Sequence, residues 1–252
     1  MDKEKYLNRI NFKGDINPCL NVLVKLQKSH LFNVPFENLD IHNKIPIILD
    51  IDKIYEKIVT NNRGGFCYEL NGLFYELLLT LNFDAKRISA RVYKNELGYT
   101  PEFDHMAIIV SIDDSEYLVD VGFGEFIFEP LKLELGTIQN DPSGNYSIDK
   151  YEDEYYRVNK VINDEFIPQY IFTQSERELF EFSGMCEYHQ TSPNSHFMQK
   201  RLITLPTENG RATITGSILK VKENNSVKER ELKDEEEFHA ELSNLFNLKK
   251  MT

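Results

Sequence analysis

Apolar residues in the first eighty positions recur with the spacing of α-helices. They repeat every three to four residues over 20–31, directly after Asn17-Pro18, a capping residue followed by a proline suited to the first helical turn. A second pattern of this kind follows Asp50. A third, with a wide apolar face over 70–81, follows the turn-forming pair Gly64-Gly65. The first third of the chain is therefore predicted to hold three helices.

From Asp84 onward the pattern becomes that of β-strands. Short segments rich in β-branched and aromatic residues alternate with acidic or glycine-containing turns, and Asn209-Gly210 and Asn224-Asn225 are predicted hairpin turns. These segments predict strands over 88–93, 105–112, 116–121, 155–161, 167–172, 200–205, 212–222 and 226–232.

Two further helices are expected among the later strands. Ser175, with Glu178 three residues on, has the spacing of a capping box and predicts a short helix toward Cys186. Asp234 precedes an amphipathic segment that predicts the last helix. Helices come first, strands second and mixed elements last, so the chain is expected to form three packed sub-domains in an α+β, multi-layer fold.

The composition is that of a soluble globular protein. Of its 252 residues, 41% are hydrophobic and 28% charged, and no run approaches the roughly 20 apolar residues that span a bilayer. The polar N-terminus lacks the apolar core of a secretory signal, so a cytoplasmic location is expected. The net charge of −12 disfavours nucleic acid as a partner, because its phosphates would be repelled.

Three cysteines, Cys19, Cys67 and Cys186, form neither a disulfide framework nor a zinc-binding pattern, so no metal is expected. Cys67 stands apart because it follows Gly64-Gly65 at the start of a predicted helix. The partial positive charge and free N–H groups of a helix N-terminus favour a thiolate, and they can also stabilise an oxyanion on a carbonyl under attack. A buried thiol that only fills the junction between turn and helix fits this local context equally well.

A histidine and an aspartate lie in two neighbouring apolar strands. A two-residue loop at Asp113-Asp114 pairs Ile112 with Ser115, which brings Ala107 opposite Asp120 and His105 opposite Gly122. His105 and Asp120 then share one face as diagonal neighbours, roughly 7–8 Å apart. A register shifted by one residue would place them on opposite faces.

Each of these residues has a simpler structural explanation when taken alone. His105 could be a satisfied histidine at a strand end, and Asp120 could accept hydrogen bonds from nearby backbone N–H groups. Together with Cys67, however, they supply the nucleophile, the base and the group that orients the base, which is what acyl transfer through a thiol requires.

At this level of detail the sequence resembles the arylamine N-acetyltransferases, cysteine enzymes that use acetyl-CoA. The resemblance runs along nearly the whole chain. It is carried by VPFENL at 34–39, RGGFCYELN at 63–71, HM at 105–106, VDVGFG at 119–124 and QTSPNS at 190–195. It implies a helical bundle over 1–83 that carries the nucleophile, a β-barrel over 84–190 that carries His and Asp, and an α/β lid over 191–252. It also implies a triad of Cys67, His105 and Asp120 like that of transglutaminases and papain-like proteases.

The resemblance implies acetyl transfer from acetyl-CoA to the nitrogen of arylamines, arylhydrazines or N-hydroxyarylamines, a reaction of xenobiotic metabolism. The reaction would be ping-pong, through an acetyl-cysteine at Cys67, with His105 moving the protons and Asp120 holding its imidazole. The expected partners are acetyl-CoA and a small aromatic amine or hydrazine. Two alternatives keep the triad but change the acyl chemistry, as an amide synthase or a thiol hydrolase, and a third only binds CoA or a partner.

Other site residues are implied with the same resemblance. Phe36, Val92 and Phe123 match positions that line the acceptor pocket, although core packing would also explain them. For CoA, the matching positions are Gly124, Tyr188 and Asn194, and Asn194 departs from the hydroxyl residue of better-known relatives.

Charged residues near these blocks give two further expectations. Glu37 and Arg63 are expected to form an ion pair beneath the catalytic turn, with a solvated pair as the alternative. No glycine-rich phosphate loop is present, so the CoA phosphates need a local basic patch. Lys200, Arg201 and Arg211 are weak candidates for it, because solvated charges at strand edges would explain them as well.

Overall fold

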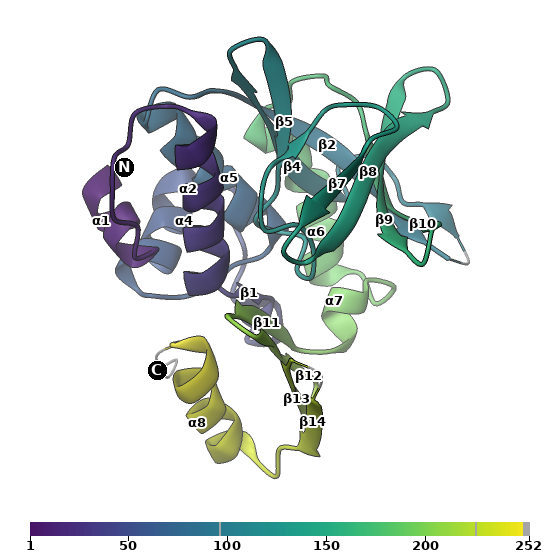
Figure 1. Cartoon of the computed structure of the whole chain (residues 1–252). Coiled ribbons are helices and arrows are strands. Elements are labelled where there is room, and N and C mark those ends of the chain that lie inside the picture. The colour runs from purple at the N-terminus through teal and green to yellow at the C-terminus, as the bar shows by residue number, and fades with distance from the viewer. Residues whose placement is uncertain (96, 225, 249–252) are drawn as a thin grey trace.

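The computed structural model of the protein describes residues 1–95, 97–224 and 226–248. A helical unit at the N-terminus packs beside a large antiparallel sheet, and a smaller sheet with the C-terminal helix lies below both in Figure 1. This arrangement is an α+β fold, as the order of sequence patterns predicts.

The three predicted N-terminal helices form with shifts at their ends, and two further helices, at Lys3–Arg9 and Leu39–His42, were not predicted. The helix expected at Pro18 begins two residues later, after Cys19 in extended conformation. Asp50 caps its helix as predicted, since its Oδ1 accepts from the backbone N–H of Lys53 at 3.1 Å. The helices are α1 (Lys3–Arg9), α2 (Leu20–Asn33), α3 (Leu39–His42), α4 (Ile51–Tyr55), the π-helical turn η1 (Glu56–Thr60) and α5 (Cys67–Thr80).

The large sheet is antiparallel and nearly closed. Its main strand order is β6-β5-β4-β2-β10-β9-β8-β7, with β3 paired to β2. At the open seam the Gln139 side chain donates to and accepts from the backbone of Lys132, both at 2.8 Å, which ties β7 to β6. The strands are β2 (Asp84–Lys94), β3 (Gly98–Tyr99), β4 (His105–Ile112), β5 (Ser115–Val119), β6 (Leu131–Lys132), β7 (Ile138–Asp141), β8 (Gly144–Tyr151), β9 (Tyr155–Ile162) and β10 (Glu165–Phe172).

The hairpin of β4 and β5 has the predicted turn but ends sooner than expected. Ile112 pairs with Ser115, and the ladder runs to Ile108 opposite Val119. The chain then leaves the sheet, so Ala107 is not paired with Asp120 and His105 is not paired with Gly122. Because Asp120 follows the strand instead of lying within it, its side chain is free to approach His105 more closely than a diagonal pair would.

The smaller sheet joins the C-terminal segment to the N-terminal one. The single strand expected over 212–222 is two strands, because Gly216, with a φ of +61°, lies in a turn between them. The last helix begins after Asp234 as predicted, with Oδ1 of Asp234 accepting from the N–H of Glu237. The elements are β1 (Phe36–Glu37), β11 (Leu202–Thr207), β12 (Gly210–Thr215), β13 (Ile218–Glu223), β14 (Ser226–Glu231) and α8 (Glu235–Phe246). Asn225 of the predicted last turn lies outside the described residues.

Three short helices connect the two sheets: η2 (Leu179–Phe182), α6 (Ser183–Thr191) and α7 (His196–Gln199). The capping box predicted at Ser175 is wrong, because Glu178 is the residue before η2 and its N–H donates to Glu181. Phe182 and Cys186 are buried in the helical core, so this segment packs on the N-terminal helices rather than inside the barrel. The division of the chain at residues 83 and 190 stays a prediction.

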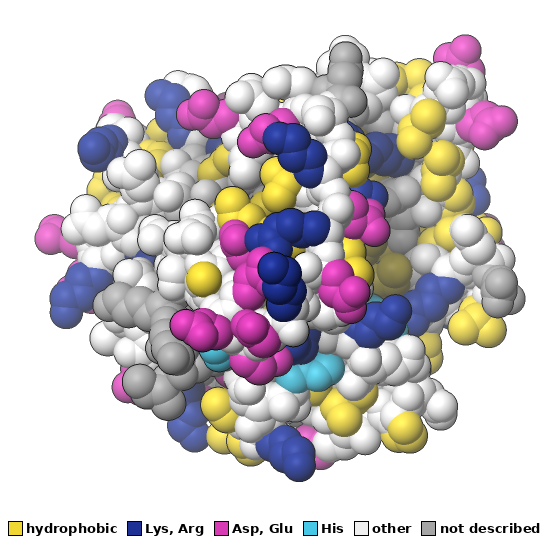
Figure 2. Space-filling view, turned by 90° about the horizontal axis from the view of Figure 1, so that it is seen from below, with side chains coloured by type: hydrophobic (Ala, Val, Ile, Leu, Met, Phe, Trp, Pro, Cys, Tyr) yellow, Lys and Arg dark blue, Asp and Glu magenta, His cyan; other side chains and the backbone are white. Residues whose placement is uncertain are grey.

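The surface carries both charge signs in close proximity. On the face in Figure 2, basic and acidic side chains are intermixed. Among the ion pairs, Arg230 pairs with Glu237 and Glu241 of α8. Within the described ranges, no helix combines the length and apolar character needed to span a membrane.

Candidate active site

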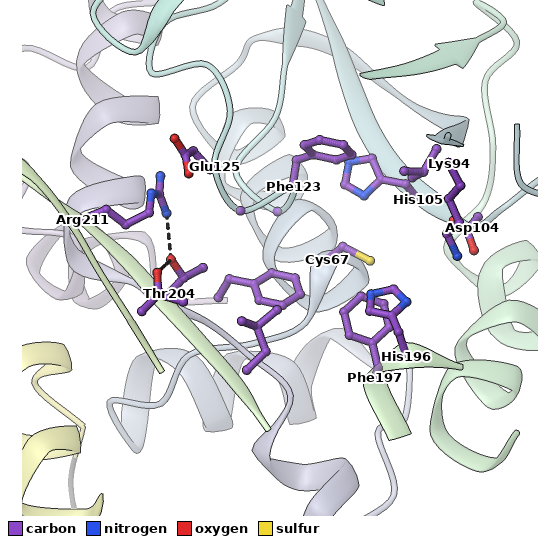
Figure 3. A pocket seen from close by; sticks show the side chains of 16 residues that line it. Cys67, Lys94, Asp104, His105, Phe123, Glu125, His196, Phe197, Thr204 and Arg211 are labelled. Carbon is purple, nitrogen blue, oxygen red and sulfur yellow. Dashed lines mark hydrogen bonds between the residues drawn. The ribbon is translucent and has the colours of Figure 1, made fainter. Parts of the chain in front are cut away.

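One cavity of about 330 Å³ lies where the start of α5, the barrel and the small sheet meet. Six of the catalytic, acceptor and CoA candidates from the sequence line it, and so does Arg211, a candidate for the basic patch. Figure 3 shows Cys67 and His105 from different elements on the same cavity. The six are Phe36, Cys67, Val92, His105, Phe123 and Gly124.

Cys67 is the first residue of α5, and two contacts fix this end of the helix. Glu69 accepts from the backbone N–H of Phe66 at 2.9 Å, which caps the helix. Gly122 packs directly on the backbone of Cys67, since a Cβ at this position would lie 3.0 Å from the Cα and carbonyl oxygen of Cys67. The thiol is thereby placed at one defined point of the cavity wall.

His105 and Asp120 are in direct contact. The Nε2 of His105 lies 2.7 Å from Oδ2 of Asp120, and both side chains are buried. Asp120 also accepts from Asn71 Nδ2 at 2.9 Å, from the N–H of Gly122 at 2.9 Å and from the hydroxyl of Tyr170 at 3.2 Å. Four donors thus surround the Asp120 carboxylate, which accepts hydrogen bonds from all of them and is fixed in position. Because Nε2 faces Asp120, Nδ1 is the ring nitrogen left for the cavity.

The electrostatic environment of Cys67 differs from the sequence expectation. Burial raises the pKa of the Cys67 thiol well above its usual value, and the carboxylates of Asp104 and Asp120 act in the same direction. The backbone N–H of Tyr68 in the first turn of α5 lowers this pKa, but it does not outweigh burial. The helix start therefore does not by itself make Cys67 a thiolate, and ionisation needs a proton acceptor beside it.

The predicted ion pair of Glu37 and Arg63 is confirmed, and it belongs to a larger buried network. Arg63 Nη2 lies 2.6 Å from Glu37 Oε1 and 2.8 Å from Asp40 Oδ1. Lys57 Nζ lies 2.7 Å from Asp40 Oδ2 and 2.9 Å from Glu69 Oε1. These side chains are at most 13% exposed, which rules out the solvated alternative. Through Glu69 the network reaches the turn before Cys67.

A second carboxylate–histidine pair lies next to the first. Asp104 Oδ1 is 3.1 Å from Nε2 of His189, whose Nδ1 is 3.1 Å from the hydroxyl of Ser195. Burial opposes ionisation of Asp104, but its hydrogen bond to His189 and the charge of that imidazole outweigh this effect and lower the pKa of Asp104. The pair ties the residue before His105 to the segment that leads into α7.

The candidate CoA residues are placed differently from one another. Gly124 lines the cavity with a φ of +96°, a conformation that favours glycine. Tyr188 and Asn194 are exposed and are not part of the cavity lining, so their contacts with CoA stay predictions. Of the three basic candidates, Lys200 is exposed and Arg201 pairs with Glu235 at 2.8 Å. Arg211 alone lines the cavity.

Several lining residues were not found from the sequence. They come from the end of β2, the residue before β4, the loop after β5, α7 and the small sheet. Nothing local in the sequence marks those from α7 and the small sheet, because they reach the site only through packing against the barrel. Asp104 and Glu125, in contrast, directly adjoin His105 and Gly124 in the chain, a signal that could have found them. The lining residues that were missed are Lys94, Asp104, Glu125, His196, Phe197, Leu202, Thr204 and Thr213.

Comparison with known proteins identifies the family of this chain. The family model described as N-acetyltransferase matches residues 19–251. Arylamine N-acetyltransferase 1 of Homo sapiens is 31% identical over 98% of this chain and 94% of its own length. The Mycobacterium marinum arylamine N-acetyltransferase in complex with CoA has a TM-score of 0.90 and 28% identity, over 98% of this chain and 93% of its own. The Bacillus cereus arylamine N-acetyltransferase, which has a Cys-His-Glu catalytic triad, has a TM-score of 0.90 and 26% identity, over 98% of each chain. The chain therefore belongs to the arylamine N-acetyltransferase family and is an acetyltransferase.

Proposed function

We propose that this enzyme transfers an acetyl group from acetyl-CoA to aromatic amines by a ping-pong mechanism through an acetyl-cysteine at Cys67. The observation that carries the proposal is the contact of 2.7 Å between Asp120 and His105, which lines the same cavity as Cys67. The three side chains together provide a nucleophile, a base and an orienting carboxylate. The family uses acetyl-CoA, and CoA is bound in the Mycobacterium marinum relative.

The first half-reaction loads the enzyme. The Sγ proton of Cys67 passes to Nδ1 of His105, and the imidazolium formed is stabilised by Asp120 through Nε2. The thiolate attacks the thioester carbonyl of acetyl-CoA, and the backbone N–H groups at the start of α5 stabilise the oxyanion. The bond between the carbonyl carbon and the CoA sulfur breaks. CoA then leaves as a thiol with the proton from His105.

The second half-reaction transfers the acetyl group from Cys67 to the amine. The amine nitrogen attacks the carbonyl of acetyl-cysteine, and His105 Nδ1 takes the N–H proton. The bond to Sγ breaks, so the acetylated amine leaves and Cys67 returns as a thiolate. Phe36, Val92 and Phe123 line the same cavity and are proposed to contact the acceptor ring. Arylhydrazines and N-hydroxyarylamines are acceptors of the same shape, and detoxification of such compounds in the cytoplasm is the proposed role.

Intact-mass measurement after addition of acetyl-CoA tests the proposal. We expect one added acetyl group on the protein, located at Cys67 by peptide mapping, and its loss when the isolated acetyl-enzyme meets 4-methylaniline. Cys67→Ala should show no adduct, whereas Cys19→Ala is a matched control because Cys19 is also a free thiol but is exposed.

Three results would contradict the proposal. One is wild-type protein that never carries the acetyl group. Another is isolated acetyl-enzyme that cannot pass the group to the amine. The last is acetyl-enzyme that loses the group to water at the same rate with and without amine, which would indicate a thiol hydrolase instead.

A further inference from the structure

Arg211 on β12 is a buried guanidinium with little to neutralise it. The residue is only 9% exposed, and its Nη1 donates to the hydroxyl of Thr204 at 3.0 Å. Among the described residues no carboxylate pairs with it, and neither its Nε nor its Nη2 makes a hydrogen bond. Burial lowers the pKa of Arg211 because the charged form is desolvated. A charge buried without a partner is costly, so its persistence calls for a function.

A comparison within the chain sharpens this point. Within the described part of the chain Arg9 also has no carboxylate partner, but its guanidinium donates to the backbone carbonyls of Ile58, Asn33 and Arg63. Arg9 is therefore satisfied by the protein itself. The guanidinium of Arg211 instead borders the active-site cavity, with donors left over for a ligand.

The cavity around Arg211 has a polar end. Thr204 Oγ1 is 2.9 Å from the hydroxyl of Thr213, and both threonines line the cavity beside Arg211. In Figure 3 Arg211, Thr204 and Glu125 lie on one side of Cys67, whereas Lys94 lies on the other. This end of the cavity therefore presents a guanidinium and hydroxyl groups, away from His105.

The walls between this end and Cys67 are apolar. Phe36, Phe123 and Leu202 line the same cavity, and the Phe123 ring packs on the His105 imidazole with centroids 5.1 Å apart. Such a site suits an aromatic ring with the amine toward the thiol and an anionic group at the opposite end. A guanidinium recognises a planar carboxylate through two parallel hydrogen bonds.

We propose that Arg211 binds an anionic group, the ring carboxylate of the acceptor, and makes the enzyme prefer aminobenzoate-type amines over uncharged arylamines. The inference rests on the proposed function, since it concerns the acceptor of the same acetyl-enzyme. A phosphate of the acetyl donor has related chemistry. A single carboxylate on a ring suits a guanidinium that is nine-tenths buried better than phosphates that carry several charges and a large hydration shell.

Glu125 is expected to weaken the preference for an anionic acceptor that Arg211 creates. Its side chain is exposed, lines the same cavity and is the acidic group whose charge acts on Arg211. A carboxylate there repels an anionic acceptor and attracts the guanidinium, so Glu125 opposes the preference that Arg211 creates.

The test compares 4-aminobenzoate with 4-aminobenzamide, which has a similar shape and no charge. The measured quantity is the ratio of kcat/KM for the anionic acceptor to kcat/KM for the neutral one. In Arg211→Met we expect this ratio to fall by roughly 10- to 100-fold, the range for loss of a charge-assisted hydrogen bond. Arg201→Met is the matched control, because Arg201 pairs with Glu235 outside the cavity, and its ratio should equal that of wild type.

A second measurement separates the possible sources of the anion. The rate of acetyl-enzyme formation from acetyl-CoA should be unchanged in Arg211→Met. If this rate falls and the acceptor ratio does not, Arg211 binds a donor phosphate and the acceptor assignment is overturned. An unchanged ratio with an unchanged loading rate also overturns the proposal.

Two controls keep the result interpretable. If Arg211→Met does not fold, Glu125→Gln takes its place. The exposed Glu125 can be neutralised without disturbing the core, and this change should raise the ratio. A ratio that stays constant or falls contradicts the proposal. Failure of the Arg211 proposal can be told apart from failure of the proposed function. In the second case wild-type protein would form no acetyl-enzyme at all.

Discussion

Substitution of Gly122 by alanine tests whether close packing holds the three site residues together. An added Cβ would lie 2.7 Å from Nδ2 of Asn71 and 3.0 Å from Cα and the carbonyl oxygen of Cys67. Ordinary contacts of a Cβ begin near 3.4 Å, so Asn71 must retreat by about 0.7 Å, the difference between 3.4 and 2.7 Å. Asn71 Nδ2 donates to Asp120, so any retreat disturbs the carboxylate that holds His105.

The expected effects follow from this geometry. Overpacking of a dense interior costs about 1–3 kcal/mol, which we expect as a loss in the free energy of unfolding of Gly122→Ala. A misplacement of reacting groups approaching 1 Å can reduce turnover by about 100-fold, so kcat/KM should fall by roughly 10- to 100-fold.

Urea denaturation and the rate of Cys67 acetylation measure the two effects. Gly184→Ala is the control, because Gly184 lies in α6 and a Cβ there would meet no atom of the described residues within 4 Å. Alanine in a helix is favoured by up to about 1 kcal/mol over glycine, so the control should be as stable as wild type or slightly more stable. A Gly122→Ala protein with unchanged stability and acetylation rate would refute the packing argument.

Two further changes probe the buried polar groups away from the cavity. Arg63→Met leaves the buried Glu37 without its main partner and should lower the free energy of unfolding by about 3–5 kcal/mol in urea denaturation; a loss below about 1 kcal/mol would mean that the network contributes little. His30 is fully buried, and burial lowers its pKa to about 3, so it stays neutral in the folded protein while the unfolded chain takes up a proton below about pH 6.5. Stability should therefore fall by about 1.4 kcal/mol per pH unit as the pH drops from 6.5 toward 3, and His30→Gln should flatten this slope; an unaltered slope in the variant would assign it to other groups.

The parts of the fold that depend on local sequence were predicted well. Helical spacing places α5, and the two-residue loop at Asp113-Asp114 sets the register of its hairpin from Ile112 onward. These features were predictable because a period of 3.6 and a two-residue turn are properties of neighbouring residues. The Cys67 site follows from the same kind of information, since a helix start and two charged residues in apolar segments are visible in the chain.

The parts that depend on distant contacts were not predicted. Strands β7 and β8 were missed because their sequences are largely polar. β8 is held by pairing with β9, and β7 by pairing with β8 and by the Gln139 contact at the barrel seam. The early end of the β5 ladder was also missed. Asp120 gains four hydrogen bonds only after it leaves the sheet, and one of its partners, Tyr170, is fifty residues away.

The two carboxylates beside Cys67 explain why its ionisation depends on His105. Asp104 and Asp120 both disfavour a negative sulfur, and burial adds to their effect. A lone thiolate is therefore opposed at this position, whereas a thiolate formed together with an imidazolium leaves the local net charge unchanged. The carboxylate that repels the sulfur stabilises the imidazolium at 2.7 Å, so Asp120 favours the ion pair even though it opposes the isolated thiolate. Removal of His105 should consequently leave Cys67 as an unreactive thiol, because the sulfur would lose the imidazolium that compensates its charge.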